Sequence, residues 1–435
     1  MSKRGRRKRT IELIKTVLIV LLSISAVYLT LQVQVQHTVP QSSPEEHPSE
    51  RFEVEGRDTV HPVRMAATMY QGVGIQRYAV QYNQAESDTL FQNTYHLLVE
   101  VLSGAQKPRE IEEQAFQQAL QQAPSLYYDW HGRIPYPVLN YWLSVENEDL
   151  MGTVRHMVLS PQGDQIWLYY QDEKDGRFYV CPSEVVSKGR MEEAFSNIKS
   201  NQAIFSFENQ EFYAFAPYTI ILEQPPVPEI YHTSNPLTQQ AQVGQLLELL
   251  NFPETTNYSY DGAGAKVVRN ESDTLRIAED GWISFEAATE GSTRYLVSGD
   301  TQQEAAEACR QLLQKVVENL CGEVRISLDD LETTGEGMYQ ISFTYLLNDT
   351  QIYAQEKLAE FTVEQGSIVS FHILVRSYTD SGTSAVVLPE RQAMAAMTTM
   401  GHENEELVLV YFDTWADTIL PSWATAGELK GRGVA

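Results

Sequence analysis

An uncharged, apolar segment near the N-terminus constrains this chain more than any other feature. No charged side chain occurs over the twenty positions of residues 16–35, TVLIVLLSISAVYLTLQVQV. Because a helix rises about 1.5 Å per residue, a segment of this length is long enough to cross the roughly 30 Å hydrocarbon core of a bilayer. The sequence therefore predicts a single N-terminal transmembrane helix.

A strongly basic tail precedes the apolar segment. Its six clustered cations are Lys3, Arg4, Arg6, Arg7, Lys8 and Arg9. Basic flanks remain in the cytoplasm, so we expect a cytoplasmic N-terminus, a single-pass anchor in the cell membrane and an extracytoplasmic body. A cleaved signal peptide is the alternative, because the tripeptides beginning at Ser23 and Ser25 resemble small-residue cleavage sites. The apolar run continues past both sites to Leu31, which favours an uncleaved anchor.

Small residues line one face of the predicted transmembrane helix. Ser23, Ala26 and Thr30 occupy positions i, i+3 and i+7. In lipid, small side chains let a second helix approach closely, whereas hydrophobic burial provides little drive for helix association. The three residues are therefore the candidate partner-binding face, although small residues are also common in membrane helices without such a contact.

The charge of the chain disfavours one class of partner. The net charge is −26, and residues 1–15 carry seven basic residues and one acidic residue. The remaining residues therefore include 25 basic and 57 acidic side chains, a net of −32. Such a field repels nucleic acid and anionic polymers, so no nucleic-acid partner is expected. Ordinary solubilising charge and attraction of a basic partner both fit this composition.

The three cysteines do not form a disulfide framework. Cys309 and Cys321 lie twelve residues apart on either side of most of a predicted helix, which separates them by about 18 Å. This separation is beyond the reach of a disulfide. Cys181, Cys309 and Cys321 are expected to be buried and to act as small apolar residues.

Proline-rich breaks divide the chain. Pro225, Pro226 and Pro228 mark the clearest boundary outside the membrane. We predict an α+β fold with antiparallel sheets, arranged as a basic tail (1–15), a transmembrane helix (16–35), a flexible neck (36–60), an N-terminal α+β domain (61–222), a linker (223–236), a middle α+β segment (237–299) and a C-terminal PepSY-like α+β domain (300–435).

Apolar residues at helical spacing predict the main helices. One helix is expected after a cap at Ser87 and Asp88, a second from Pro108, and a third over residues 184–198. The clearest helix opens with a capping box formed by Thr301 and Glu304. Its apolar face consists of Ala305, Ala308, Cys309, Leu312, Val316 and Leu320.

Strand patterns fill much of the rest. A three-strand meander is predicted between residues 154 and 181, and a hairpin is predicted to pair residues 203–207 with 211–215. Asp280 and Gly281 form the expected tight turn between two further strands.

No motif of an enzyme or metal site occurs in the sequence. It lacks His-Glu-x-x-His, Gly-x-Ser-x-Gly, a phosphate loop and Cys-x-x-Cys. We therefore expect a non-enzymatic protein, and we predict no catalytic residue, cofactor or metal ligand.

Aromatic residues with polar tips cluster in one stretch of the chain. Tyr127, Tyr128, Trp130 and Tyr136 could together hold a glycan or peptide, because their rings supply rigid contact area and a hydrogen-bonding tip. They form the candidate ligand patch. Packing of a domain corner is the alternative.

The chain resembles the YycH/YycI group of regulators of low-GC Gram-positive bacteria. The resemblance lies in the basic tail and anchor, the aromatic and meander region 127–180, the strand-turn-strand of 266–285, and the ending Leu407–Tyr411 followed by Leu420–Trp423, which is similar to PepSY-like modules. It implies an extracytoplasmic body of mixed α and β structure. It also implies association with the WalK (YycG) sensor histidine kinase and no catalytic residues.

The expected function follows from the anchor and this resemblance. We predict a membrane-anchored regulator of a two-component sensor histidine kinase that acts through transmembrane and extracytoplasmic contacts. A paralogous regulator is a second candidate partner. The alternative function is a membrane-anchored module that binds a glycan or peptide of the cell envelope.

Overall fold

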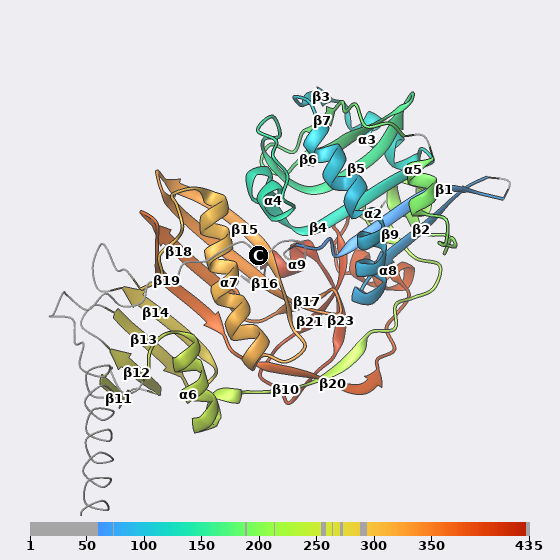
Figure 1. Ribbon diagram of the computed structural model, residues 1–435. Coiled ribbons are helices and arrows are strands. Elements are labelled where there is room, and N and C mark those ends of the chain that lie inside the picture. Colours follow the sequence, from blue (N-terminus) through green and yellow to red (C-terminus); the bar gives the residue numbers. More distant parts are fainter. Residues whose placement is uncertain are drawn as a thin grey trace, which may run out of the picture. The chain divides into compact units, whose positions relative to one another are not determined.

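The computed structural model describes residues 60–431, except 73, 188, 213, 254–257, 263, 270–272 and 288–293. These residues belong to one compact unit. Their strands form a seven-stranded sheet, an eleven-stranded sheet and two small sheets (Figure 1). Helices accompany both large sheets, and among the described strand pairs only β17 and β21 run parallel. The predicted α+β class with antiparallel sheets is confirmed.

The seven-stranded sheet belongs to the N-terminal lobe, which we define as the described residues up to 222. Its strand order is β2-β1-β4-β5-β6-β7-β3. The predicted meander forms β5, β6 and β7, which pair in antiparallel order. The bounds are β1 Arg64–Gln71, β2 Gly74–Gln81, β3 Arg109–Ile111, β4 Ser125–Pro135, β5 Thr153–Gln162, β6 Gln165–Asp172 and β7 Phe178–Cys181.

Helices cover both faces of this sheet. Met157 of β5 belongs to the core cluster that contains Phe91 of α2, whereas the next residue, Val158, belongs to the cluster that contains Phe116 of α3. Because successive side chains of a strand point to opposite faces, the two helices lie on opposite sides. The N-terminal lobe contains α2 Gln84–Gly104, α3 Glu113–Gln121, α4 Tyr136–Trp142 and α5 Arg190–Ala194.

The eleven-stranded sheet belongs to the C-terminal lobe, the described residues from 223 onward. Its order is β11-β12-β13-β14-β19-β18-β16-β17-β21-β23, and β15 pairs with the other side of β16. The bounds are β11 Tyr258–Gly262, β12 Ala265–Arg269, β13 Asp273–Ala278, β14 Trp282–Ala287, β15 Arg325–Gly335, β16 Met338–Leu347, β17 Thr350–Tyr353, β18 Ala359–Glu364, β19 Ser367–Leu374, β21 Leu407–Phe412 and β23 Pro421–Thr425.

This sheet joins two segments that are predicted to be separate. Strand β14 comes from the expected middle segment (237–299), and β19 comes from the expected C-terminal domain (300–435). The two strands pair directly through Phe285 and Phe371. The boundary at residue 299 therefore does not separate two sheets.

Helix α7, Gln302–Leu320, packs across β15, β16, β18 and β19 (Figure 1). Its capping box is confirmed, because the Thr301 side chain accepts from the backbone N–H of Glu304 and the Glu304 carboxylate accepts from that of Thr301. Every residue of its predicted apolar face is buried. The other helices of this lobe are α6 Gln240–Leu249, α8 Glu390–Thr399 and α9 Ala426–Gly431.

The predicted hairpin of residues 203–215 is wrong. Strand β8, Ile204–Phe205, pairs instead with β9, Ile220–Ile221, and the residues between them include two short 3-10 helices, Ser206–Glu208 and Gln210–Phe212. The reason is packing. The side chain of Phe212 is drawn into a cluster with Met394 of α8, which a local hairpin would not allow.

Two predicted helices are shorter than expected. Residues 109–111 form β3, which pairs with β7, and helix α3 begins only at Glu113. Likewise α5 covers only Arg190–Ala194 of the predicted 184–198. Upstream of α5 the backbone is held by the β5–β6 hairpin, where the Ile166 N–H donates to the Val185 carbonyl. A long-range partner therefore replaces local helix formation in both places.

The predicted linker of residues 223–236 contains a paired strand. Strand β10, Glu229–Ser234, lies between β20, Ser377–Ser384, and β22, Thr418–Ile419. A third 3-10 helix, Pro236–Thr238, follows it. The prolines interrupt the chain only up to residue 228, and partners about 150 or more positions away then order the segment.

The predicted tail, the transmembrane helix and the neck up to residue 59 lie outside the described residues. This includes the candidate partner-binding face of Ser23, Ala26 and Thr30. Within the described residues, no helix has both the length and the apolar character needed to cross a membrane.

Candidate functional site

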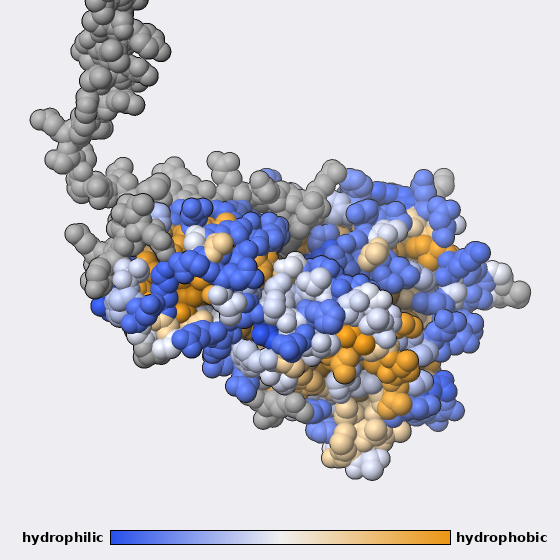
Figure 2. Space-filling view, turned by 90° about the horizontal axis from the view of Figure 1, so that it is seen from below, coloured by the Kyte–Doolittle hydropathy of each residue, from blue (hydrophilic) through white to orange (hydrophobic). Residues whose placement is uncertain are grey.

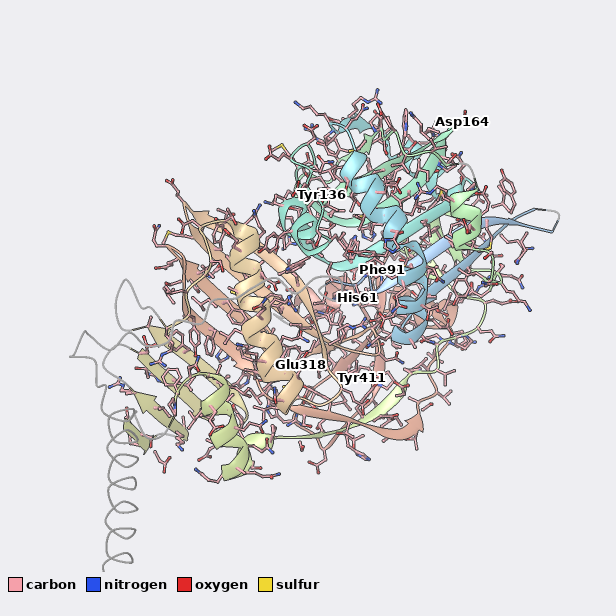
Figure 3. The ribbon with its side chains drawn as sticks, viewed as in Figure 1. His61, Phe91, Tyr136, Asp164, Glu318 and Tyr411 are labelled. Carbon is pink, nitrogen blue, oxygen red and sulfur yellow. The ribbon has the colours of Figure 1, made fainter. Side chains whose placement is uncertain are left out.

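A cleft of about 820 Å³ is lined by residues of both lobes. Helices α2 and α4 supply one wall, and α7 and β15 supply the other. His61 and Glu318, which are labelled in Figure 3, both line it. Concave spaces between structural units with a few convergent polar groups are common ligand sites, so this cleft is the candidate functional site.

An arginine of β15 joins the two walls. Arg325 donates from Nη1 to Asp88 Oδ1 of α2 at 2.9 Å and from Nη2 to Asp88 Oδ2 at 2.6 Å. His61 Nδ1 lies 3.3 Å from the same carboxylate. On its other side, Arg325 Nη1 lies 3.5 Å from Oδ1 of the buried Asp349. One guanidinium therefore faces two carboxyl groups.

The two carboxyl groups differ in ionisation. Burial opposes the charge of Asp88, but the neighbouring His61 and Arg325 outweigh burial and hold the pKa of Asp88 below its usual value. For Asp349 burial dominates over the attraction of Arg325 and raises the pKa to about 7. Asp88 is therefore charged at neutral pH, whereas Asp349 gains its charge only as the pH rises through about 7.

The wall of α7 and β15 contains a second neutralised arginine, Arg310. Glu307 of α7 is buried and accepts from Trp142 Nε1 of α4 at 2.7 Å. It also accepts from Arg310 Nε at 2.8 Å and from Arg310 Nη2 at 2.9 Å. This carboxylate ties the two lobes together and balances the charge of Arg310.

Three glutamates of the cleft accept hydrogen bonds from neutral donors. Glu229 accepts from the Tyr231 hydroxyl at 2.7 Å, Glu318 accepts from Gln314 Nε2, and Glu323 accepts from a backbone N–H at 3.4 Å. Neutral donors leave the formal charge of a carboxylate uncancelled. Arg310 and Arg325, the arginines among the described lining residues, are already paired with carboxylates, so the remaining potential of the cleft is negative.

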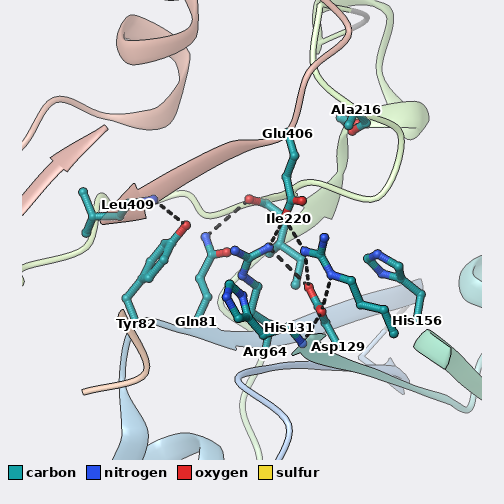
Figure 4. Close-up of polar contacts among 12 residues, drawn as sticks. Arg64, Gln81, Tyr82, Asp129, His131, His156, Ala216, Ile220, Glu406 and Leu409 are labelled. Atoms are coloured by element: carbon teal, nitrogen blue, oxygen red, sulfur yellow. Dashed lines mark hydrogen bonds and ion pairs between the residues drawn. The ribbon is translucent and has the colours of Figure 1, made fainter. Parts of the chain in front are cut away.

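A buried ion network connects the lobes at a second place (Figure 4). Arg155 donates to Asp129 Oδ1 at 2.9 Å and to Glu406 Oε1 at 2.7 Å, and Arg64 bonds to the same two carboxylates. Burial opposes both acidic charges, but the guanidinium groups outweigh it and lower the pKa of Asp129 and of Glu406. All four groups are balanced and largely enclosed, so we assign the network to structure.

The four aromatic residues of the candidate ligand patch lie in the core. Tyr127, Tyr128, Trp130 and Tyr136 are each at most 2% exposed. Tyr127 belongs to one core cluster and lies 2.6 Å from His156 Nδ1 through its hydroxyl, whereas the other three belong to another cluster. The expected surface patch is not formed, because these large rings bury their area between sheet and helices instead.

Other candidate features contribute nothing to the cleft. The described residues contain no group of three or more His, Cys, Asp or Glu side chains placed to hold a metal ion. Cys181, Cys309 and Cys321 are buried and free, as predicted, and burial raises the pKa of Cys181 and Cys321 to about 12.

Figure 2 shows one face of the molecule, which is mostly hydrophilic and has one area where hydrophobic residues gather. Among the residues that the structure describes, none of the exposed large apolar side chains lines the cleft.

Comparison with known proteins adds evidence on the fold. No protein-family profile and no curated protein matches the sequence. A solved structure, the crystal structure of YycH from Bacillus subtilis, superposes with a TM-score of 0.50 at 12% identity. The superposition covers 86% of this chain and 96% of that chain. This chain has a YycH-like fold. At this identity the likeness concerns the fold alone, and it agrees with the architecture that the sequence resemblance implied.

The residues of the cleft carry no motif in the sequence. The predicted helix cap at Ser87 and Asp88 is wrong, because α2 begins at Gln84 and is capped by Asn83, whose side chain accepts from the Glu86 N–H. Asp88 instead faces Arg325, 237 positions away. No local pattern signals such a pair, so only the YycH-like fold brings these residues together.

Proposed function

We propose that this protein is a non-enzymatic, membrane-anchored regulator of a two-component sensor histidine kinase. The observation that carries the proposal is the YycH-like fold over 86% of the chain. The YycH/YycI group, which the sequence also resembles, consists of regulators associated with the WalK kinase. The basic tail and the uncharged segment of residues 16–35 supply the anchor in this proposal.

The proposed action is a shift of the kinase between conformations. A partner that packs better against one conformation stabilises it by the difference between the two packing free energies. A difference of about 1–3 kcal/mol changes the equilibrium roughly 5- to 150-fold. In the membrane, the face of Ser23, Ala26 and Thr30 would make the contact, because small residues permit close helix approach.

Leucine substitutions test this contact. Replacing Ser23, Ala26 and Thr30 together by leucine is expected to reduce co-purification of the full chain with a co-expressed WalK-type sensor histidine kinase and to change autophosphorylation of that kinase. Ser25, Tyr28 and Gln32 lie on the opposite side of an ideal helix, so their replacement by leucine is the matched control. Equal association and kinase output in both variants would remove the membrane face from the proposal.

The structure does not support the alternative function, which is binding of an envelope glycan or peptide. That alternative rested on Tyr127, Tyr128, Trp130 and Tyr136, whose side chains are buried. Regulation through protein contacts therefore remains the proposed function.

A further inference from the structure

The first half of β15 is an unpaired sheet edge that faces the cleft. Among the described strands, β15 pairs with β16 alone, and residues 323–328 line the cleft one after another. Within the described residues, Arg325–Leu328 make no backbone hydrogen bond outside the β15–β16 ladder. Such an edge presents N–H and C=O groups with which an added strand can pair.

The approach of Gly132 shows which groups of β15 point outward. A Cβ atom on Gly132 would lie 1.8 Å from the Leu328 carbonyl oxygen, so this oxygen points away from β16 and towards β4. In an antiparallel ladder each residue directs its N–H and C=O to the same side, and the side alternates. The register is regular from Arg325 to Leu328, so Ile326 also points its N–H and C=O outward. Beyond Leu328 the β4 segment closes the edge.

Charge determines what kind of strand fits beside this edge. Arg310 and Arg325 are each paired with a carboxylate of the protein. Glu318 and Glu323 are exposed, and they accept hydrogen bonds from neutral donors. An incoming segment therefore meets uncancelled negative charge next to unpaired backbone groups.

We propose that the cleft binds an extended, basic segment of a partner protein, which adds to β15 at Ile326 as a further strand. Main-chain hydrogen bonds to Ile326 supply affinity independent of sequence, and Glu318 and Glu323 select lysine or arginine side chains. The site goes beyond the proposed function, because it defines a ligand class and holds whether or not the partner is a sensor kinase.

The chain's own preceding segment fits the cleft poorly. Residues 45–58 lead directly to Val60, which lines the cleft. They contain six acidic and two basic side chains, so their charge has the same sign as the cleft. Like charges disfavour this occupant, whereas a basic segment from another protein is attracted.

A labelled peptide tests the site. We expect fluorescein-Lys-Val-Lys-Thr-Lys-Val-Lys to bind the full chain in detergent solution, with an affinity that falls as NaCl is raised. The same peptide with alternate amides N-methylated keeps its charge but cannot extend a ladder, so its binding should be lost. Peptide binding should also slow hydrogen exchange at the Ile326 amide. No binding of the unmodified peptide, or equal binding of the methylated peptide, would overturn the proposal.

Matched glutamate variants locate the site. The double variant Glu318→Gln/Glu323→Gln should weaken peptide binding about 3- to 10-fold. Glu332→Gln is the control, because Glu332 is an exposed glutamate of β15 outside the cleft and its loss should leave affinity unchanged. Weaker binding in the control alone would place the site on the sheet face and contradict the proposal.

Replacing residues 45–58 by a Gly/Ser linker tests the chain's own segment as the occupant. Peptide binding that appears only after this replacement would assign the cleft to that segment and would also contradict the proposal. The assay contains no kinase, so its failure leaves the kinase test unaffected.

Discussion

Arg325 of β15 and Asp88 of α2 form a two-point ion pair at 2.9 and 2.6 Å, although 237 positions separate them in the chain. Parallel hydrogen bonds between a guanidinium and a carboxylate fix orientation as well as distance. The pair therefore sets how the wall of α2 meets β15, beside the edge residue Ile326.

Replacing Asp88 by asparagine should lower the free energy of unfolding by about 1–2 kcal/mol at pH 7, discounted for partial exposure. The pKa of Asp88 is lowered in the fold, so its stabilising charge is present above its ordinary value of 3.8 and is lost as the pH falls below it. Urea unfolding at pH 7 and pH 2 measures the difference. A gap between wild type and variant that is as large at pH 2 as at pH 7 would contradict the ion-pair account.

Replacing Asp349 by asparagine should have the opposite effect. Burial raises the pKa of Asp349 from 3.8 to about 7, so its ionisation costs the fold stability as the pH rises through this range. Asparagine also tolerates the left-handed φ of 59° at this position. The variant should be about 1–3 kcal/mol more stable than the wild type at pH 8 and similar to it at pH 4. A variant that is less stable at pH 8 would show that the charged form is the favoured one.

Replacing Gly132 by alanine should destabilise the junction of β4 with β15. The added methyl group would lie 1.8 Å from the Leu328 carbonyl, so backbone must move, at a cost of about 1–3 kcal/mol. Gly244 of α6 is the matched control, because nothing lies within 4 Å of a Cβ there and alanine favours a helix. Thermal unfolding should show a lower midpoint for the first variant and an equal or higher midpoint for the control. Equal midpoints for wild type and Gly132→Ala would refute the close contact.

Replacing Glu406 by glutamine should be the most damaging of these changes. Arg64 and Arg155 would keep their buried charges with only Asp129 to balance them. Removing one charged partner from a buried network lowers the free energy of unfolding by about 3–5 kcal/mol. The exposed pair of Arg177 and Glu110 provides the control, and Arg177→Met should not change the urea midpoint measurably. Similar midpoints for the two variants would show that the network does not hold the lobes together.

Features that depend on neighbouring residues were predictable. The capping box of Thr301 and Glu304 and the buried face of α7 follow from helical spacing, and both are confirmed. The turn at Gly281 is also confirmed, since its φ of 101° requires a residue without a side chain. In each case the deciding interactions lie within a few positions along the chain.

Features that depend on distant partners were not predictable. Residues 109–111 pair with β7 instead of starting a helix. Ile204 pairs with Ile221 instead of with the predicted hairpin partner, residues 211–215. The aromatic stretch around Trp130 is as suitable for a core as for a ligand surface, and its composition does not distinguish the two. Burial is decided only when sheets and helices assemble around the side chain.

The sequence by itself determined the α+β class, the strongest helix, the buried cysteines, the acidic character of the body and the apolar segment from which an anchor is expected. Only the tertiary structure decided the cleft, because its residues come from α2, α4, α7, β10, β15 and β16, and no local pattern connects them. It likewise decided that Tyr127, Tyr128, Trp130 and Tyr136 are core residues and that β15 keeps a free edge at Ile326. Local interactions specify elements, whereas charge pairing and burial between distant segments specify sites.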